Sequence, residues 1–354
     1  MLPLIGLFLP LLLVFIPLSF LTLFVESRSG LLLTAETKRT LFGSDRKRRK
    51  HSSGKGGSSV GKTALLLIAH PDDECMFFAP TVIELVKSGA DVEVLCLSQG
   101  NADGLGDVRP TELVKSCKAL GILDSSKVSC LDHAELQDDP NAWWKASVIA
   151  DVLSAHIGDR AIEAIITFDQ YGISGHANHR ALFDGLRYFQ SLPMVPGRAF
   201  VANNEDANQP YSSAGRQSRR LSSRGAPVCY ALKSISILRK YSGVLDLPYT
   251  VLNFLVRKHI LPHRRLRASS SRTTLRASTV DAIKEKAAKA GLRTRKPKTS
   301  RGPSAPTEAV FVGGPLQAIQ GCNAMTCHKS QLVWFRYLYL LFSRYMVINE
   351  LVEI

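Results

Sequence analysis

Short apolar runs alternate with segments of helical spacing from residue 64 to about residue 190. The first run, ALLLIAH, is continuously apolar, which is typical of a strand buried on both faces of a parallel sheet. We predict further strands at 91–98, 127–132 and 161–169, with helices at 74–88, 109–120, 142–156 and from 176 onward. This order indicates βαβ units, and therefore a Rossmann-like α/β fold with a mostly parallel sheet and helices on both faces.

The alternation stops after residue 195. Two polar, basic segments, 202–225 and 263–307, contain few aromatic residues, and we predict that both are disordered insertions. Strand and helix patterns return at 228–242, at 310–312 and in the aromatic tail from residue 332 to 348. Two internal arginines make that tail a poor spanning helix, which favours packing on the core over contact with lipid.

The first 25 residues contain no charged side chain. An apolar run of about 20 residues is long enough to cross a bilayer, and no Lys or Arg precedes it as in a signal peptide. The basic residues between 38 and 50 favour a cytoplasmic location for the following flank. We therefore predict a transmembrane anchor over 1–25, a basic flexible linker over 26–63 and a cytosolic domain over 64–354.

Cysteine usage and charge exclude several classes of protein. The seven cysteines show no C-x-x-C spacing, which argues against a secreted disulfide framework and a Cys-type zinc module. The formal net charge of +15 is concentrated in the insertions and the linker. Because these segments offer few aromatics for base stacking, nucleic acid is not expected as a partner, and an anionic lipid surface is favoured.

The stretch GGSSVGKTALLLIAHPDDE, residues 56–74, contains two candidates for an active site. Its first half fits G-x-x-x-x-G-K-[ST], the phosphate-binding loop of nucleotide hydrolases. That loop requires a preceding strand and a following helix, whose N-terminal N–H groups meet the phosphates. Here a Gly/Ser-rich linker precedes the match and a strand follows it, which disfavours a phosphate-binding loop.

The second half, AHPDDE, follows the first predicted strand, at the end of a parallel sheet where ligands bind. His70 supplies an imidazole, and the adjacent Asp72 and Asp73 point apart, so one can bind a metal while the other faces a water. Catalytic Zn²⁺ takes three nitrogen or oxygen ligands. His176 and His179 lie just beyond the strand predicted over 161–169. Their i, i+3 spacing places both side chains on one face of a helical turn, so one can complete the metal site while the other faces substrate.

Four segments resemble the LmbE-like de-N-acetylase family, above all its eukaryotic branch, which acts on N-acetylglucosaminyl-phosphatidylinositol. They are AHPDDE (69–74), LSQGNADGLGDVRPTEL (97–113), TFDQYGISGHANHRA (167–181) and HKSQLVWFRYLYLLFSRYM (328–346). The resemblance implies a zinc-dependent amidohydrolase that deacetylates this glycolipid, the second step of GPI-anchor biosynthesis. It also implies a single-pass protein of the endoplasmic reticulum membrane with its catalytic domain facing the cytosol.

The resemblance further implies a role for each motif residue. His70, Asp73 and His179 would bind zinc, Asp72 would be the general base, and His176 would polarise the acetyl carbonyl and protonate the leaving amine. Chemistry supports these roles. A metal lowers the pKa of its bound water, so a carboxylate can take the proton, and the oxyanion that forms on the acetyl group requires a hydrogen-bond donor. The alternatives are a deacetylase of another N-acetylglucosamine conjugate and a basic membrane-binding module without catalysis.

Several other positions stay open at the sequence level. Arg109 either binds the lipid phosphate bidentately or forms a surface salt bridge. Asp132 either faces the sugar or caps a turn. Glu74 either orients the ligands or favours the start of a helix through its charge. His328 lies in a matching segment without an assigned role.

Overall fold

The computed structural model describes residues 16–23, 62–192, 194–196, 219–221, 226–259 and 307–354. The chain forms two compact units, residues 1–246 with 306–354 and residues 247–305. The described part of the second unit is a single helix, α9 (Leu247–His259). The sheet and the candidate site both belong to the first unit.

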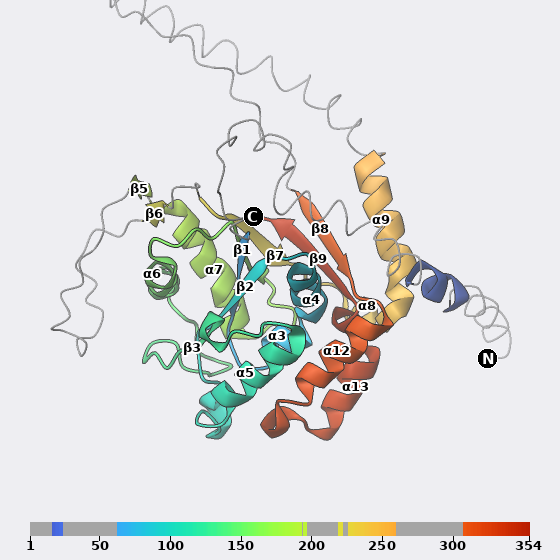
Figure 1. Ribbon diagram of the computed structural model, residues 1–354, viewed down its shortest axis with the longest axis horizontal. Helices are drawn as coiled ribbons and strands as arrows, with labels where there is room; N and C mark the ends of the chain where they lie inside the picture. Colours follow the sequence, from blue (N-terminus) through green and yellow to red (C-terminus); the bar gives the residue numbers. More distant parts are fainter. Residues whose placement is uncertain (1–15, 24–61, 193, 197–218, 222–225, 260–306) are drawn as a thin grey trace, which may run out of the picture. The chain divides into compact units, whose positions relative to one another are not determined.

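A seven-stranded sheet in the order β3-β2-β1-β4-β7-β9-β8 forms the core of the first unit (Figure 1). Its strands are β1 (Thr63–Ile68), β2 (Asp91–Cys96), β3 (Val128–Cys130), β4 (Ala164–Phe168), β7 (Val228–Leu232), β8 (Glu308–Val312) and β9 (Ile348–Glu353). The first five strands pair in parallel, whereas β9 runs antiparallel to both β7 and β8. The α/β fold is confirmed, and β9 makes its mainly parallel sheet a mixed one.

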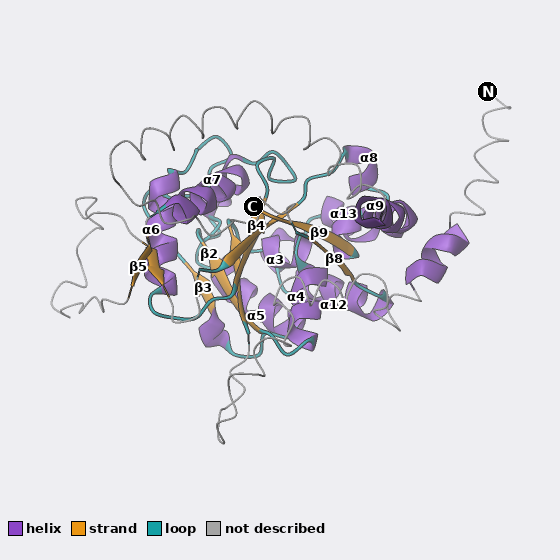
Figure 2. Cartoon of the chain, turned by 90° about the horizontal axis from the view of Figure 1, so that it is seen from above, coloured by secondary structure: helices purple, strands orange, loops and turns teal. Residues whose placement is uncertain are grey.

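Helices flank this sheet on two sides (Figure 2). They are α3 (Asp73–Met76), α4 (Ala79–Lys87), α5 (Arg109–Leu120), α6 (Ala146–Ile157), α7 (Ala177–Ser191), α8 (Ile237–Lys240), α12 (Pro315–Met325) and α13 (Trp334–Phe342). Helices α6 and α7 pack against each other, and α12 packs against α4 and α5. All five residues of β4 are buried, as expected for a strand covered on both faces.

The helix predicted over 74–88 is interrupted. Helix α3 ends at Met76, and α4 begins at Ala79 with Pro80 in its first turn. Proline has no N–H to donate to the carbonyl four residues earlier, but it fits the first turn of a new helix. The short α3 therefore stands apart from α4 and follows directly on the motif that contains Asp72 and Asp73.

Two elements near the chain's end were not predicted, the helix α12 and the strand β9. Strand β9 lies between β7 and β8, which are separated from each other by about eighty residues of sequence. Its apolar residues alternate only weakly with polar ones, and its place depends on pairing with distant partners. Local sequence patterns carry no information about such a partner.

Most of the predicted anchor, linker and insertions lie outside the described residues. Residues 16–23 form a helical segment, and among the helices that the structure describes none is long and apolar enough to cross a bilayer. Within the insertion predicted over 202–225, residues 219–221 form β6 (Arg219–Leu221), paired with β5 (Met194–Pro196). Almost all of the insertion predicted over 263–307 is likewise outside the described residues.

Candidate active site

The candidate site lies where the strand order reverses, beyond the carboxyl ends of β1 and β4. The chain leaves β1 for its neighbour β2 on one side, whereas β4 pairs with β1 on the other side. In open α/β sheets the crevice at this reversal receives ligands. The AHPDDE motif follows β1 and the HANH motif follows β4, so both motifs reach the same crevice.

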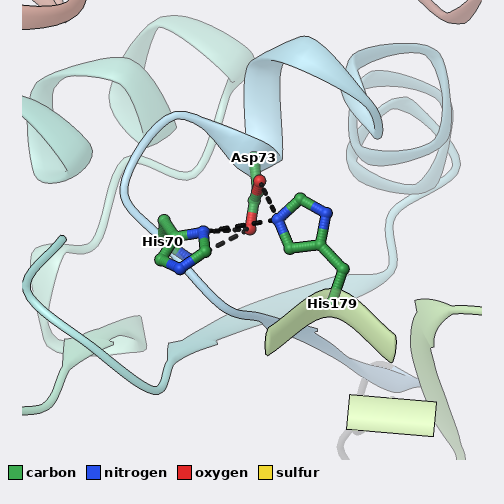
Figure 3. Close-up of side chains that lie close together, drawn as sticks. All are labelled: His70, Asp73 and His179. Atoms are coloured by element: carbon green, nitrogen blue, oxygen red, sulfur yellow. Dashed lines mark hydrogen bonds and ion pairs between the residues drawn. The ribbon is translucent and has the colours of Figure 1, made fainter. Parts of the chain in front are cut away.

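His70, Asp73 and His179 converge on one point (Figure 3). His179 Nε2 lies 3.1 Å from Asp73 Oδ1 and 3.3 Å from His70 Nδ1. All three are buried, with exposed fractions of 6%, 1% and 4% in chain order. The structure thus brings together the three residues that we predicted as metal ligands.

Hydrogen bonds behind these side chains orient their donor atoms. His179 Nδ1 lies 3.2 Å from the carbonyl oxygen of Gly172, and His70 Nε2 lies 3.0 Å from Asn178 Oδ1. Each ring therefore carries its proton on the outer nitrogen and directs the lone pair of the other nitrogen inward. Asp73 Oδ2 accepts hydrogen bonds from the backbone N–H groups of Ala69 and His70. Two inward-facing imidazole nitrogens and an oriented carboxylate form a donor set that suits a divalent metal ion.

The charge of Asp73 is stabilised by the same neighbours. Burial by itself raises the pKa of this carboxyl, but His179 and His70 and the backbone N–H of His70 together hold it well below its usual range. Asp73 is therefore ionised at neutral pH, as a metal ligand must be.

Two other clusters in the described part of the chain have metal-like spacing, but each fits less well. The first combines His70 with Asp138 and His176, and its Asp138 is already 3.6 Å from the guanidinium of Arg109. The second combines Glu74, Cys75 and His328. There burial raises the pKa of the Cys75 thiol well above its usual value, so the thiol stays protonated, while Glu74 and His328 bond to each other.

Asp72 is held in a strained backbone conformation beside the predicted metal ligands. Its φ of 124° is rare for a residue other than glycine. The carboxylate of Glu74 accepts the Asp72 N–H at 3.1 Å, and the Asp72 carboxylate lies 3.0 Å from Arg336 Nη2. Burial raises the pKa of Asp72, while Arg336 and Arg109 oppose this rise. A buried carboxylate with a raised pKa suits a general base.

His176 precedes α7 and faces the same crevice. Its ring centroid is 4.8 Å from that of His70 and 5.1 Å from that of His179. Nδ1 accepts the N–H of Asn178 at 3.3 Å, so the proton of the neutral ring is on Nε2. Burial, together with the charges of His70 and His179, lowers its pKa to about 4. A lowered pKa favours a ring that donates a hydrogen bond through Nε2, and the role of His176 as the acid stays a prediction.

A pocket of about 760 Å³ opens over these residues. Its walls include the predicted metal ligands together with Asp72, His176 and Arg109. Asp132, predicted to contact the sugar, is exposed, does not line this pocket and accepts a hydrogen bond from the Gln137 amide. Asp138 lines the pocket instead of Asp132. Nothing in the sequence distinguished Asp138 from the other acidic residues of its loop.

Arg109 lines the pocket, and both of its terminal nitrogens donate to backbone carbonyls, whereas its buried Nε has no hydrogen-bond partner among the described residues. Nη1 donates to the carbonyl of Gly100 at 2.7 Å, and Nη2 donates to that of Pro71 at 2.6 Å. Asp72 and Asp138 each lie 3.6 Å away. Arg109 is only 5% exposed, so it is not the surface salt-bridge partner that we considered, and it ties together two loops of the site.

Three further side chains at the site received no role from the sequence. Arg336, from α13, reaches Asp72 across more than 260 residues of sequence. His328 bonds to Glu74 through Nε2 at 2.7 Å, and both side chains are completely buried. Asn178 lies inside the HANH motif, and its position between the two histidines was the one available signal. In the tail that contains Arg336, Tyr339, Tyr345 and Met346 are buried against the core, whereas most apolar side chains of α13 are exposed.

Comparison with known proteins agrees with this geometry. A model of the PIG-L family, described as GlcNAc-PI de-N-acetylase, matches residues 65–188. The N-acetylglucosaminyl-phosphatidylinositol de-N-acetylase of Bos taurus is 33% identical over 291 residues, covering 82% of this chain and 83% of the bovine protein. A probable enzyme of the same name from Dictyostelium discoideum is 30% identical over 295 residues, covering 83% of this chain and 94% of that protein.

Among solved structures, a deacetylase of teicoplanin biosynthesis aligns with a TM-score of 0.42 and 12% identity, covering 83% of this chain and 99% of that chain. The curated relatives match far more of the chain than the AHPDDE and HANH motifs alone. They also confirm the resemblance inferred from those motifs, and the chain belongs to the PIG-L family.

Proposed function

We propose that this chain hydrolyses the acetamide of N-acetylglucosaminyl-phosphatidylinositol and releases acetate and glucosaminyl-phosphatidylinositol. The observation that carries the proposal is the convergence of His70, Asp73 and His179 beside a buried Asp72 in one pocket. The names of the family and of its curated relatives support this choice of substrate. The reaction would be the second step of GPI-anchor biosynthesis.

We propose Zn²⁺ as the metal, held by His70 Nδ1, the Asp73 carboxylate and His179 Nε2. Three nitrogen or oxygen ligands are typical of catalytic zinc, although the donor set also suits other divalent ions. When bound, such an ion supplies a Lewis acid that lowers the pKa of a water molecule towards ~7.

Asp72 would accept the proton of the attacking water. Its carboxylate is buried at the pocket wall, and Arg336 stabilises its ionised form before the reaction. Once protonated, Asp72 can deliver this proton to the leaving amine. This route agrees with the lowered pKa of His176 and is an alternative to the acid role predicted for that histidine.

His176 would stabilise the oxyanion that develops on the acetyl group. Its Nε2–H is free to point into the pocket because Nδ1 already accepts the N–H of Asn178. A neutral, oriented donor in a dry site is worth several kcal/mol, of the order of 100-fold to 1000-fold in kcat.

We also propose a location for the enzyme. Residues 1–25 would anchor it in the endoplasmic reticulum membrane, a basic linker over 26–63 would follow, and the catalytic domain over 64–354 would face the cytosol. The apolar first segment and its basic flank support this topology. The basic insertions over 202–225 and 263–307 would add attraction to anionic lipid.

The proposal is tested by acetate release from the glycolipid by the purified full-length chain. We expect activity that a chelator abolishes and added Zn²⁺ restores. Asp72→Asn should lose activity by at least 1000-fold while its metal content, measured by elemental analysis, stays unchanged. Full activity of Asp72→Asn would overturn the assignment of the base, and chelator-resistant activity would overturn the metal.

A further inference from the structure

Among the described residues, three lysine or arginine side chains line the pocket: Arg109, Lys240 and Arg336. Arg109 donates to two backbone carbonyls, and Arg336 forms an ion pair with Asp72 at 3.0 Å. Both arginines therefore have partners within the protein. Lys240, at the end of α8, differs from them.

No carboxylate of the described residues lies within 4.0 Å of Lys240 Nζ. The Lys240 ammonium lies over the ring of Tyr241, whose centroid is 5.6 Å from Nζ. Lys240 is half-buried, and this burial lowers its pKa. A partly desolvated ammonium at a pocket wall without a counterion gains free energy when an anion binds beside it.

Ring contacts connect Tyr241, the residue after Lys240, with the site. The Tyr241 ring meets the Tyr339 ring edge-on at 6.5 Å, and the Tyr339 hydroxyl donates to the carbonyl of Met76 at 2.9 Å. This chain of contacts leads from Lys240 through α13 to the end of α3. Lys240 itself lies on the wall of the pocket that also contains Asp72 and Asp73.

One part of the pocket's outer edge, on α13, is apolar. Phe335, Leu338 and Phe342 line it and are 51%, 49% and 48% exposed. The metal-binding residues are at most 6% exposed, and Lys240 is half-buried. The pocket thus combines buried metal-ligand candidates, a half-buried lysine without a carboxylate partner among the described residues, and exposed apolar side chains at part of its edge.

We propose that Lys240 binds the phosphodiester of the glycolipid substrate, while the apolar edge on α13 contacts the first carbons of its acyl chains. This inference rests on the proposed function. A lipid-linked sugar has chemistry that matches these three features: a neutral sugar, one negative charge and an apolar tail. Arg109, which we had considered for this phosphate, is already committed to protein oxygens.

The test compares three substrates with purified full-length enzyme: the glycolipid in detergent micelles, its deacylated soluble form that keeps the phosphate, and N-acetylglucosaminyl-inositol without phosphate. We expect Lys240→Met to raise KM about tenfold for both phosphate-bearing substrates, the loss typical of one charge-assisted contact. The phosphate-free substrate should keep its KM, and kcat should change little. Lys240→Arg should restore most of the affinity.

Lys118→Met is the matched control, because this exposed lysine of α5 does not line the pocket. It should leave all three substrates unaffected. Equal effects of Lys240→Met on all substrates, or none on any, would overturn the inference. So would an effect that appears only on vesicles containing anionic lipid, since Lys240 would then bind headgroups of the membrane.

A direct binding measurement separates this inference from the proposed function. If the wild-type chain deacetylates none of the substrates, the proposed function fails. Calorimetric binding of the deacylated phosphate-bearing compound to wild type and to Lys240→Met then still tests the subsite. Equal affinity of the two proteins would contradict a phosphodiester contact at Lys240.

Discussion

At the scale of single residues, the site depends on groups that hold the reactive side chains in place. The backbone strain at Asp72 is of the order of 1–3 kcal/mol, and it persists only where neighbours over-determine the conformation. Glu74 accepts the Asp72 N–H, and Met76 donates its N–H to the Asp72 carbonyl at 3.0 Å. Asn178 holds His70 in place in the same way, because its Oδ1 accepts a hydrogen bond from His70 Nε2.

Asn178→Ala should weaken metal binding, because His70 Nε2 loses a buried acceptor that fixes its tautomer. The expected loss is about 10-fold to 100-fold in metal affinity. Competition with a chromophoric chelator measures it, and activity should recover at high metal concentration. Asn323→Ala, at an exposed position in α12, is the control. Unchanged metal affinity in Asn178→Ala would show that Asp138, also 3.0 Å from Nε2, suffices.

At the scale of elements, α3 has only four residues and cannot be stable by itself. Segments from the end of the chain hold it in place. His328, just before the 3₁₀ turn at Lys329–Gln331, bonds to Glu74, and Tyr339 of α13 donates to the carbonyl of Met76. The C-terminal segment therefore supports the candidate site, although every predicted metal ligand precedes residue 180.

Glu74→Gln should destabilise this junction, because it leaves the buried His328 without its charged partner. Breaking one side of a buried pair costs roughly 3–5 kcal/mol. Thermal unfolding measures the loss, and kcat should fall with it because the Asp72 amide loses its acceptor. A double-mutant cycle with His328→Asn isolates the pair. Strictly additive effects of the two substitutions would contradict a direct coupling between α3 and the C-terminal segment.

At the scale of the whole first unit, a buried ion network ties the last strand to the sheet. Arg344, completely buried, lies 2.7 Å from both Asp246 and Glu350. Lys233, just after β7, and Arg239 of α8 also face Glu350. The network therefore joins β7, β9 and α8, which connects the scaffold below the active site with the helix that carries Lys240.

The network predicts a dependence of stability on pH. Burial raises the pKa of Glu350, but Arg344, Lys233 and Arg239 outweigh it and lower the pKa below its usual value of 4.5. A lowered folded-state pKa contributes stability that is present above pH 4.5 and lost as the pH falls through the folded value. Acid should therefore destabilise the wild type in this range.

Glu350→Gln should remove this contribution. We expect it to lower stability by about 3 kcal/mol at pH 7, because Arg344 loses one buried partner, and to flatten the acid-dependent loss below pH 4.5. Thermal unfolding at pH 7 and pH 4 measures both effects. Glu135→Gln, in an exposed pair with Lys145, is the control and should change little. If Glu350→Gln loses as much stability between pH 7 and pH 4 as the wild type does, the pH dependence belongs to other carboxyls.

The parts that local patterns encode were predictable. The continuous apolar run before His70 specifies a strand covered on both faces, and glycine at position 121 ends a helix where predicted. The ends of strands in a parallel sheet share one edge, so the sequence also predicted that His70 and His179 would meet. For Asp132 the sequence left the sugar and a turn cap open, and the structure places it outside the pocket, because a loop's course is set by its contacts and not by periodicity.

By itself, the sequence determined the α/β alternation, the family and the three converging metal-ligand candidates, because strand and helix periods and motif spacing are local properties. Only the tertiary structure decided that Arg336 reaches Asp72, that His328 supports Glu74 and that Lys240 lines the same pocket. The first two contacts join residues 264 and 254 positions apart. Their geometry depends on how the C-terminal segment packs over α3, which no periodic pattern in the chain records.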